Sequence, residues 1–326
     1  GILSAQFYGS GNAEGVRDTF RFKLLFGVIL SAIFAVIFLT VGEPLIQQFI
    51  HQGEGIGDLE ATRSYGKAYL EVIVIGILPF ALTQCYSGTL RETGETVIAI
   101  VAGWTHKHVA RNPFIRGALR SFKIPGSLLK QIVAIGLPLF INELMWSFGI
   151  TFMTQCYSVR GLEVVAAFNI ANTISNVFNV VFLSLGNAVG IIIGQMLGAG
   201  RLEEAKREDK QLIAFSVFCC FLTGAMLILL SPLFPRMYNT EEIVKGLATQ
   251  LIFITGCCQP LYGFVHGTYF TLRAGGKSVV TFLFDSTYMW VIPIPIVFAL
   301  TRFTAIPVQL VYLLADLSSL IKCICG

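Results

Sequence analysis

The chain has 326 residues, of which 55% are hydrophobic and only 13% are charged, and its formal net charge is +4. A soluble domain of this size needs many more charged side chains to cover its surface, and it would not reach the mean hydropathy of +0.73 found here. The composition therefore excludes an ordinary soluble protein and indicates an integral membrane protein.

Apolar runs long enough to cross a bilayer as helices recur along the whole chain. In chain order they are 24–42, 68–90, 131–159, 164–190, 211–235, 246–272, 278–301 and 303–321. A membrane β-barrel would instead show alternating polarity in strands of about ten residues. The runs predict an all-α, multi-pass protein of the cell membrane.

Two stretches of the chain repeat one another. GILSAQFYGSGNAEGVR at 1–17 matches GIIIGQMLGAGRLEEAK at 190–206. An apolar run, a polar loop and a second apolar run follow each copy, and the second run ends in TLRETG at 89–94 and in TLRAGG at 271–276. This order predicts two helical bundles in the same orientation, related by an internal repeat.

The repeat also predicts the domain limits and a gap. We expect a first helical bundle at 1–104, a basic cytosolic linker at 105–130 and a second bundle of six transmembrane helices at 131–326. Two spanning runs follow TLRAGG, whereas about ten apolar residues follow TLRETG, too few to cross a bilayer. We therefore expect the first of two six-helix bundles to be incomplete, without its first helix, most of its second helix and a hairpin near 95–105.

If successive apolar runs cross the bilayer in alternating directions, most Lys and Arg side chains lie on the same side of the membrane. The positive-inside rule makes that side cytosolic. The linker adds six basic and no acidic residues between His106 and Lys130. A nucleic-acid-binding arm is one interpretation of this linker, but we favour a cytosolic linker that contacts anionic headgroups, and we expect no nucleic-acid partner.

The sequence shows no pattern that is typical of an enzyme or a metal site. The eight cysteines lie in or beside apolar runs without zinc-ligand spacing, and we expect them to be inert small apolar residues. No Ser/His/Asp or Cys/His set falls plausibly on one surface. We predict neither catalysis nor a cofactor.

Several motifs in their order resemble the multidrug and toxic compound extrusion (MATE) family over essentially the whole chain. They are GxxxxQxxGxG in both copies, TLRETG, WTHKHVARNPFI before the second bundle, and GLPLFINELMWS at its start. The resemblance implies a V-shaped pair of bundles that exports drugs or toxic, cationic amphipathic compounds in exchange for protons or sodium by alternating access. The acidic residue of the family's first helix has no counterpart here. We expect a monomer that binds small organic substrates within the lipid bilayer.

Two other functions remain open. One is a flippase for lipid-linked oligosaccharides, built on a related two-bundle plan and requiring a cationic cavity for pyrophosphate. Lys and Arg are absent from the predicted helix interiors, whereas Glu143 and Asp285 are present, so a cationic substrate fits better. The other is a non-transporting fragment, in view of the missing helices.

Glu143 is the only charged residue between Lys130 and Arg160. It lies roughly 20 Å along a helix from Lys130, near the middle of a hydrocarbon layer of about 30 Å. An ionised group there costs ~2.5–3.5 kcal/mol unless it meets water, a partner or a proton. In the family a Glu at this position binds the coupling ion, and we predict ion coupling by Glu143 and by Asp285, roughly 12 Å deep in its helix. The alternatives are interhelical or structural hydrogen bonds. Asp316 is expected nearer the headgroups.

Two polar stripes at helical spacing predict a substrate cavity. The first consists of asparagines, Asn172, Asn176 and Asn179 with Asn169 and Asn187 beside them. The second consists of Gln259, Tyr262 and His266 with Thr255 and Tyr269. Asn142, next to Glu143, is added to the predicted cavity. Helix–helix hydrogen bonds by the asparagines and a structural histidine are the alternatives.

Overall fold

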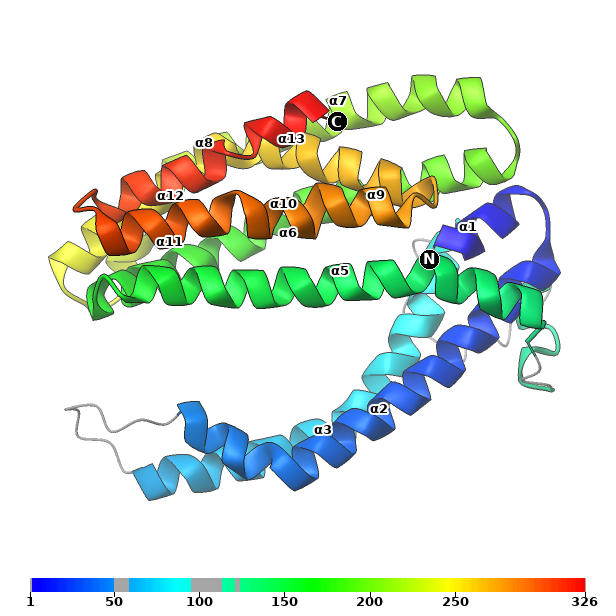
Figure 1. The fold of residues 1–326 in the computed structure, drawn as a ribbon, viewed down its shortest axis with the longest axis horizontal. Helices are drawn as coiled ribbons and strands as arrows, with labels where there is room; N and C mark the ends of the chain where they lie inside the picture. The colour runs from blue at the N-terminus through cyan, green and yellow to red at the C-terminus, as the bar shows by residue number, and fades with distance from the viewer. Residues whose placement is uncertain (1, 50–58, 95–112, 121–123, 326) are drawn as a thin grey trace. The chain divides into compact units, whose positions relative to one another are not determined.

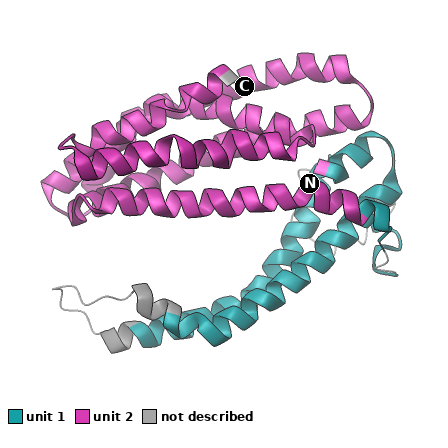
Figure 2. Cartoon of the chain, viewed as in Figure 1, with its two compact units in different colours: residues 1, 3–128 teal, residues 2, 129–326 magenta. Residues whose placement is uncertain are grey.

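The computed structural model describes residues 2–49, 59–94, 113–120 and 124–325 of the chain (Figure 1). Within these ranges nearly every residue is helical and no strand occurs, which confirms the prediction of an all-α protein. The chain forms two compact units, Leu3–Leu128 and Leu129–Gly326 (Figure 2). The predicted domain limits stay a prediction, and the hairpin expected near 95–105 lies outside the described residues.

Unit 1 (Leu3–Leu128) is built around two long helices. Its elements are α1 (Ile2–Gly9), α2 (Ala13–Phe49), α3 (Leu59–Glu92) and the 3-10 turns η1 (Pro113–Ile115) and η2 (Ala118–Arg120). The buried residues at one end of the α2–α3 pair are Val16, Phe20, Leu24, Leu90, Phe114, Ile115 and Ala118. Lys23 of α2 donates to Thr89 of α3 over 3.1 Å and forms an ion pair with Glu92. These contacts fasten α2 to the cytosolic end predicted for α3.

Unit 2 (Leu129–Gly326) contains the remaining helices. In chain order they are α5 (Gly126–Ser158), α6 (Leu162–Gly198), α7 (Leu202–Leu230), η3 (Phe234–Met237), α8 (Glu242–Ala274), α9 (Ser278–Phe282), the π-helical turn η4 (Leu283–Thr287), α10 (Tyr288–Val291), α11 (Pro293–Phe303), α12 (Val308–Leu317) and α13 (Leu320–Cys325). Figure 1 shows α12 and α13 beside α8, and α10 and α11 beside α5. The bundle is therefore formed by helices that are distant in the sequence.

Six helical segments of the described chain are long and apolar enough to cross a membrane. They are Ala13–Pro44, Arg63–Glu92, Gly126–Ser158, Leu162–Gly198, Leu202–Leu230 and Ser278–Phe303. The predicted run 246–272 also lies within one helix, α8, but polar residues along α8 lower its hydropathy. The multi-pass arrangement agrees with the sequence.

The last two predicted spans are interrupted rather than continuous. The span 278–301 is interrupted by η4 and again at Ile292, where Pro293 lacks the amide hydrogen that an unbroken helix requires. The span 303–321 does not form one helix: its first residues are extended, and a turn at Ser318–Ser319 separates α12 from α13. Interrupted helices leave backbone polar groups that must find partners in the protein interior.

Glycines of α8 allow the neighbouring helix α7 to approach closely. A Cβ atom on Gly224 of α7 would lie 2.4 Å from the carbonyl oxygen of Gly256, and one on Gly263 of α8 would lie 2.8 Å from the sulfur of Cys220. Small residues at such interfaces bring helix backbones together where lipid offers no hydrophobic driving force. This contact fixes α8, which also carries the polar stripe, and Gln259 of the stripe lies next to Gly224.

The glycine motif of the repeat forms the same turn twice. Gly11 follows α1 with φ 74°, and Gly200 follows α6 with φ 76°. Each glycine N–H donates to a carbonyl oxygen three residues earlier, Tyr8 at 3.0 Å and Leu197 at 3.1 Å. Positive φ angles favour glycine, so the motif marks a helix end. The equal geometry confirms the internal repeat at this point.

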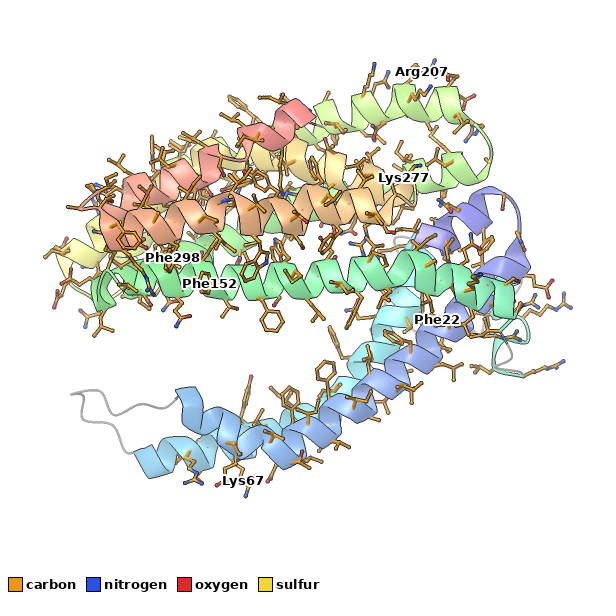
Figure 3. The ribbon with its side chains drawn as sticks, in the orientation of Figure 1. Phe22, Lys67, Phe152, Arg207, Lys277 and Phe298 are labelled. Carbon is orange, nitrogen blue, oxygen red and sulfur yellow. The ribbon has the colours of Figure 1, made fainter. Side chains whose placement is uncertain are left out.

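Aromatic packing holds α5 against α11. Figure 3 shows Phe152 of α5 and Phe298 of α11 next to each other, and their ring centroids are 6.4 Å apart. At the same end of α5, Arg160 donates to the carbonyl oxygens of Leu300 and Thr301 over 2.8 and 2.7 Å. The guanidinium thereby satisfies carbonyls that the end of α11 leaves without helical partners.

Candidate ion and substrate site

Glu143 lies in the middle of α5 and is part of a polar contact with α8. Its Oε1 accepts a hydrogen bond from Arg273 Nη1 over 2.9 Å and one from the Tyr269 hydroxyl over 3.3 Å. Arg273 Nη1 also donates to the Tyr269 oxygen over 3.2 Å. The Glu143 side chain is 54% exposed and that of Arg273 30% exposed. The carboxylate is therefore paired, and it is neither enclosed by apolar side chains nor isolated.

Asn142, the residue before Glu143, connects α5 to the π-helical turn η4. Asn142 is fully buried, and its Nδ2 donates to Asp285 Oδ2 over 3.1 Å and to the Tyr269 oxygen over 3.3 Å. Ser286 donates through its Oγ to Asn142 Oδ1 over 2.7 Å and to the Asn142 backbone oxygen over 2.8 Å. The π-helical turn presents Asp285 and Ser286 to one amide, and such turns are frequent at functional sites.

Lys322 of α13 completes this set of contacts. Its Nζ donates to Asp285 Oδ1 over 3.1 Å and lies 5.3 Å from the centroid of Phe284 and 4.7 Å from that of Tyr288. Lys322 is only 8% exposed. The inference that the helix interiors lack Lys and Arg is therefore wrong for Lys322. The sequence places it at the end of an apolar run, but the turn at Ser318–Ser319 and the packing of α13 on α8 bury it.

These contacts form one connected chain of side chains, here called the ion-pair network. It consists of Arg273, Glu143, Tyr269, Asn142, Asp285 and Lys322, in this order. The structure thus brings the two predicted coupling residues, Glu143 and Asp285, into one network. Sequence reasoning missed Arg273 and Lys322, although the spacing of four residues between Tyr269 and Arg273 places them on one face of α8.

The ion-pair network contains two acidic and two basic side chains, so its charges balance. A proton or another cation that binds either carboxylate must compete with the Arg273 or Lys322 partner. A cation bound to either carboxylate would therefore remove a contact between helices.

The asparagines of the stripe on α6 differ in their burial and in their contacts. Asn179 accepts a hydrogen bond from Gln259 Nε2 over 3.1 Å, and Gln259 is fully buried between α6 and α8. This pair fits the interhelical alternative. Asn172 and Asn176 are exposed, and no hydrogen bond joins them to Glu143 or Asp285. Their part in a substrate cavity stays a prediction.

His266 and Tyr262 differ in their surroundings. The His266 ring packs on Phe182 with centroids 4.3 Å apart, and its Nδ1 lies 3.0 Å from the Tyr262 backbone oxygen. These contacts suit a structural histidine. The Tyr262 hydroxyl lies next to the carboxyl group of Asp316. Oδ2 of Asp316 is buried within unit 2, where α12 packs along α8, and the expected depth of this residue stays a prediction.

Metal-binding side chains do not gather in the described ranges, where no group of three or more His, Cys, Asp or Glu side chains could hold a metal ion. The polar contacts of unit 2 are hydrogen bonds and ion pairs between single side chains.

Residues 1–105 and 138–299 match the MatE family model. This chain belongs to the MATE family. It is 22% identical to the probable multidrug resistance protein YoeA of Bacillus subtilis, over 94% of this chain and 75% of YoeA. It is 21% identical to the probable multidrug resistance protein NorM of Thermotoga maritima, over 93% of this chain and 73% of NorM.

The fold is similar to that of solved MATE structures. One is an outward-facing multidrug resistance MATE transporter of the MOP superfamily, with a TM-score of 0.81 and 17% identity over all of this chain and 80% of that chain. Another is a MOP superfamily transporter from Pyrococcus furiosus, described as having a binding pocket of reverse polarity, with a TM-score of 0.84 and 17% identity over the same shares. This MATE chain is thus a multi-pass membrane protein, as its apolar helices predict.

Proposed function

We propose that this MATE chain is a secondary-active multidrug exporter that exchanges amphipathic organic compounds for ions, with Glu143 and Asp285 as the ion-binding carboxyl groups. The names of its relatives YoeA and NorM, both probable multidrug resistance proteins, support export of toxic compounds. Transport rather than catalysis fits the family.

The observation that carries the proposal is the bridge between the two carboxyl groups. Glu143 and Asp285 lie on different helices, yet Tyr269 and Asn142 join them through hydrogen bonds of 3.1 to 3.3 Å. A change of charge at one carboxyl group alters the hydrogen bonds available to the other. Two such groups can therefore respond as a pair to one ion.

A proton that binds Glu143 removes the charge that holds Arg273. The ion pair between α5 and α8 is then lost, and the Tyr269 hydroxyl is free to change partner. Protonation of Asp285 acts in the same way on Lys322 and releases α13. Protonation of either carboxyl group therefore favours the conformation of the bundle in which that group is open to water on the opposite side of the membrane. A bound ion shifts a conformational equilibrium in this way when it binds one conformation more tightly than the other.

The charge of the substrate is the finer part of the proposal. Glu143 is half exposed, and an exposed carboxylate attracts an organic cation, so we propose cationic amphipathic substrates for a monomeric exporter.

A second candidate is an anionic substrate, as for a flippase of lipid-linked compounds. The partly exposed Arg273 guanidinium favours it, and the P. furiosus relative is described as having a pocket of reverse polarity.

The test is dye efflux from proteoliposomes that contain the full chain, with a proton gradient or a sodium gradient imposed separately. Ethidium serves as the cationic dye and carboxyfluorescein as the anionic one. We expect Glu143→Gln to abolish gradient-driven ethidium efflux without impairing membrane insertion. Glu163→Gln is the matched control, since Glu163 is an exposed carboxylate in the first turn of α6.

Unchanged ethidium efflux in Glu143→Gln would remove Glu143 from the mechanism. Efflux of carboxyfluorescein instead of ethidium would favour the anionic candidate. Absence of efflux with either gradient, in a chain that inserts normally, would favour the non-transporting fragment.

A further inference from the structure

Asp316 is a partly buried acid of unit 2, and it lies outside the ion-pair network. It occupies the last turn of α12, directly before the turn at Ser318–Ser319 that separates α12 from α13. Its Oδ2 is enclosed by protein and has no hydrogen-bond partner. Asp285, by contrast, accepts from Asn142 and Lys322. Asp285 is thus paired with a cation, whereas the hydrogen-bond donor beside Asp316 is the neutral Tyr262.

The groups that face Asp316 are neutral. Tyr262 of α8 donates a hydrogen bond to the carboxyl group. The other groups near it are Tyr157 of α5, Cys258 of α8, Tyr288 of α10 and Tyr312 of its own helix. Thiols and phenols carry no positive charge. Within the described residues, the carboxyl group of Asp316 has no basic partner.

Two further polar atoms in unit 2 are also buried without partners. The Tyr157 hydroxyl is buried without a hydrogen bond, and so is Oε1 of Gln259, which lies on α8 one turn before Tyr262. Native proteins leave few buried polar atoms unsatisfied, and each such atom calls for an explanation. For Oδ2 of Asp316, a bound proton or cation is such an explanation.

An ionised carboxylate cannot remain in these surroundings without compensation. Burial of an isolated charge in a membrane protein is costly, and such a group is neutralised or paired instead. A bound hard cation would need several oxygen ligands. A proton needs only the one oxygen that lacks a partner, and the resulting O–H can donate to a neighbouring acceptor.

We propose that Asp316 binds a proton in the interior of unit 2, separately from the Glu143–Asp285 network. The bound proton sits on the carboxyl group as an O–H bond, and it leaves to water when the helices around the Ser318–Ser319 turn open. The hydroxyl of Ser318 lies 2.7 Å from that of Tyr288, so two polar groups adjoin the turn. This proposal goes beyond the function proposed above and stands whether or not Glu143 and Asp285 couple transport.

Infrared difference spectroscopy of the purified full chain tests the proposal, because a protonated carboxyl group has a carbonyl stretching band that a carboxylate lacks. We expect this band in the original chain at neutral pH without sodium, and we expect Asp316→Asn to remove it. Tyr262→Phe should keep the band but change its frequency, because the neighbouring hydroxyl is gone. The matched control Glu163→Gln should leave band and frequency unchanged.

Three outcomes would overturn the proposal. One is a band that is unchanged in Asp316→Asn, which would assign it to another acid. Another is a chain with no such band at neutral pH, in which Asp316 is ionised. The third is a band that sodium alone removes in the original chain, which would make the site a sodium site. None of these depends on dye efflux, so they are distinguishable from a failure of the proposed exporter.

Discussion

The two ion pairs of the network differ in burial, and burial decides what each contributes to stability. The Glu143 and Arg273 side chains are 54% and 30% exposed, whereas those of Asp285 and Lys322 are 19% and 9% exposed. Exposed pairs contribute at most about 1 kcal/mol. Removal of one partner from a buried pair leaves an uncompensated charge and costs about 3–5 kcal/mol.

The difference in burial predicts unequal effects for two similar substitutions. Arg273→Gln should lower the free energy of unfolding by about 1 kcal/mol or less. Lys322→Gln should lower it by about 3–5 kcal/mol, because Asp285 loses its only basic contact among the described residues. Denaturant unfolding in detergent, followed by tryptophan fluorescence, measures both.

The double variant Lys322→Gln, Asp285→Asn separates charge from packing. It should recover much of the lost stability, since neither partner is then charged. Equal losses in Arg273→Gln and Lys322→Gln would contradict the view that burial sets the importance of these pairs.

Helix packing in unit 2 depends on glycines that a sequence pattern shows only as small residues. Gly224 and Gly256 let the backbones of α7 and α8 meet, whereas a Cβ atom on Gly136 of α5 would meet no neighbouring atom within 4 Å. All three are in helices with ordinary backbone angles. The effect of a methyl group at each glycine is therefore a matter of the space around it.

Gly224→Ala should destabilise unit 2 by about 1–3 kcal/mol, because its Cβ would overlap the Gly256 carbonyl oxygen. Gly136→Ala should stabilise the chain by up to about 1 kcal/mol through helix propensity. Thermal unfolding of both variants in the same detergent gives the comparison. A loss of stability in Gly136→Ala as large as that in Gly224→Ala would show that helix contact at Gly224 is unimportant.

The charge pattern predicts the orientation of the entire chain in the membrane. Lys206 and Arg207 lie on exposed positions near the start of α7, on the side predicted to be cytosolic, and Arg207 is labelled in Figure 3. Met237 is 79% exposed in η3, at the opposite end of α7. The two ends of α7 should therefore face different compartments.

Cysteine labelling in intact cells checks this orientation. In a chain whose native cysteines are replaced by alanine, Met237→Cys should react with a membrane-impermeant maleimide added outside. Lys206→Cys should react only after the membrane is permeabilised. The reverse pattern would show that the positive-inside rule assigns the wrong orientation here.

Local patterns were sufficient for much of this protein's architecture. Apolar runs predicted the long helices because bilayer thickness sets their length, and the repeated motif predicted that two parts of the chain are alike. The same patterns predicted ion coupling by Glu143 and Asp285, since a charge within an apolar run is rare.

Contacts between distant segments decided the rest. In the sequence, Arg273 and Lys322 lie at the ends of apolar runs. Packing of α8 places Arg273 against Glu143, and packing of α13 places Lys322 against Asp285. The same packing encloses Asp316 and pairs Asn179 with Gln259. A residue's own neighbours in the chain report its depth along a helix, whereas its burial and partners depend on which other helix lies across from it.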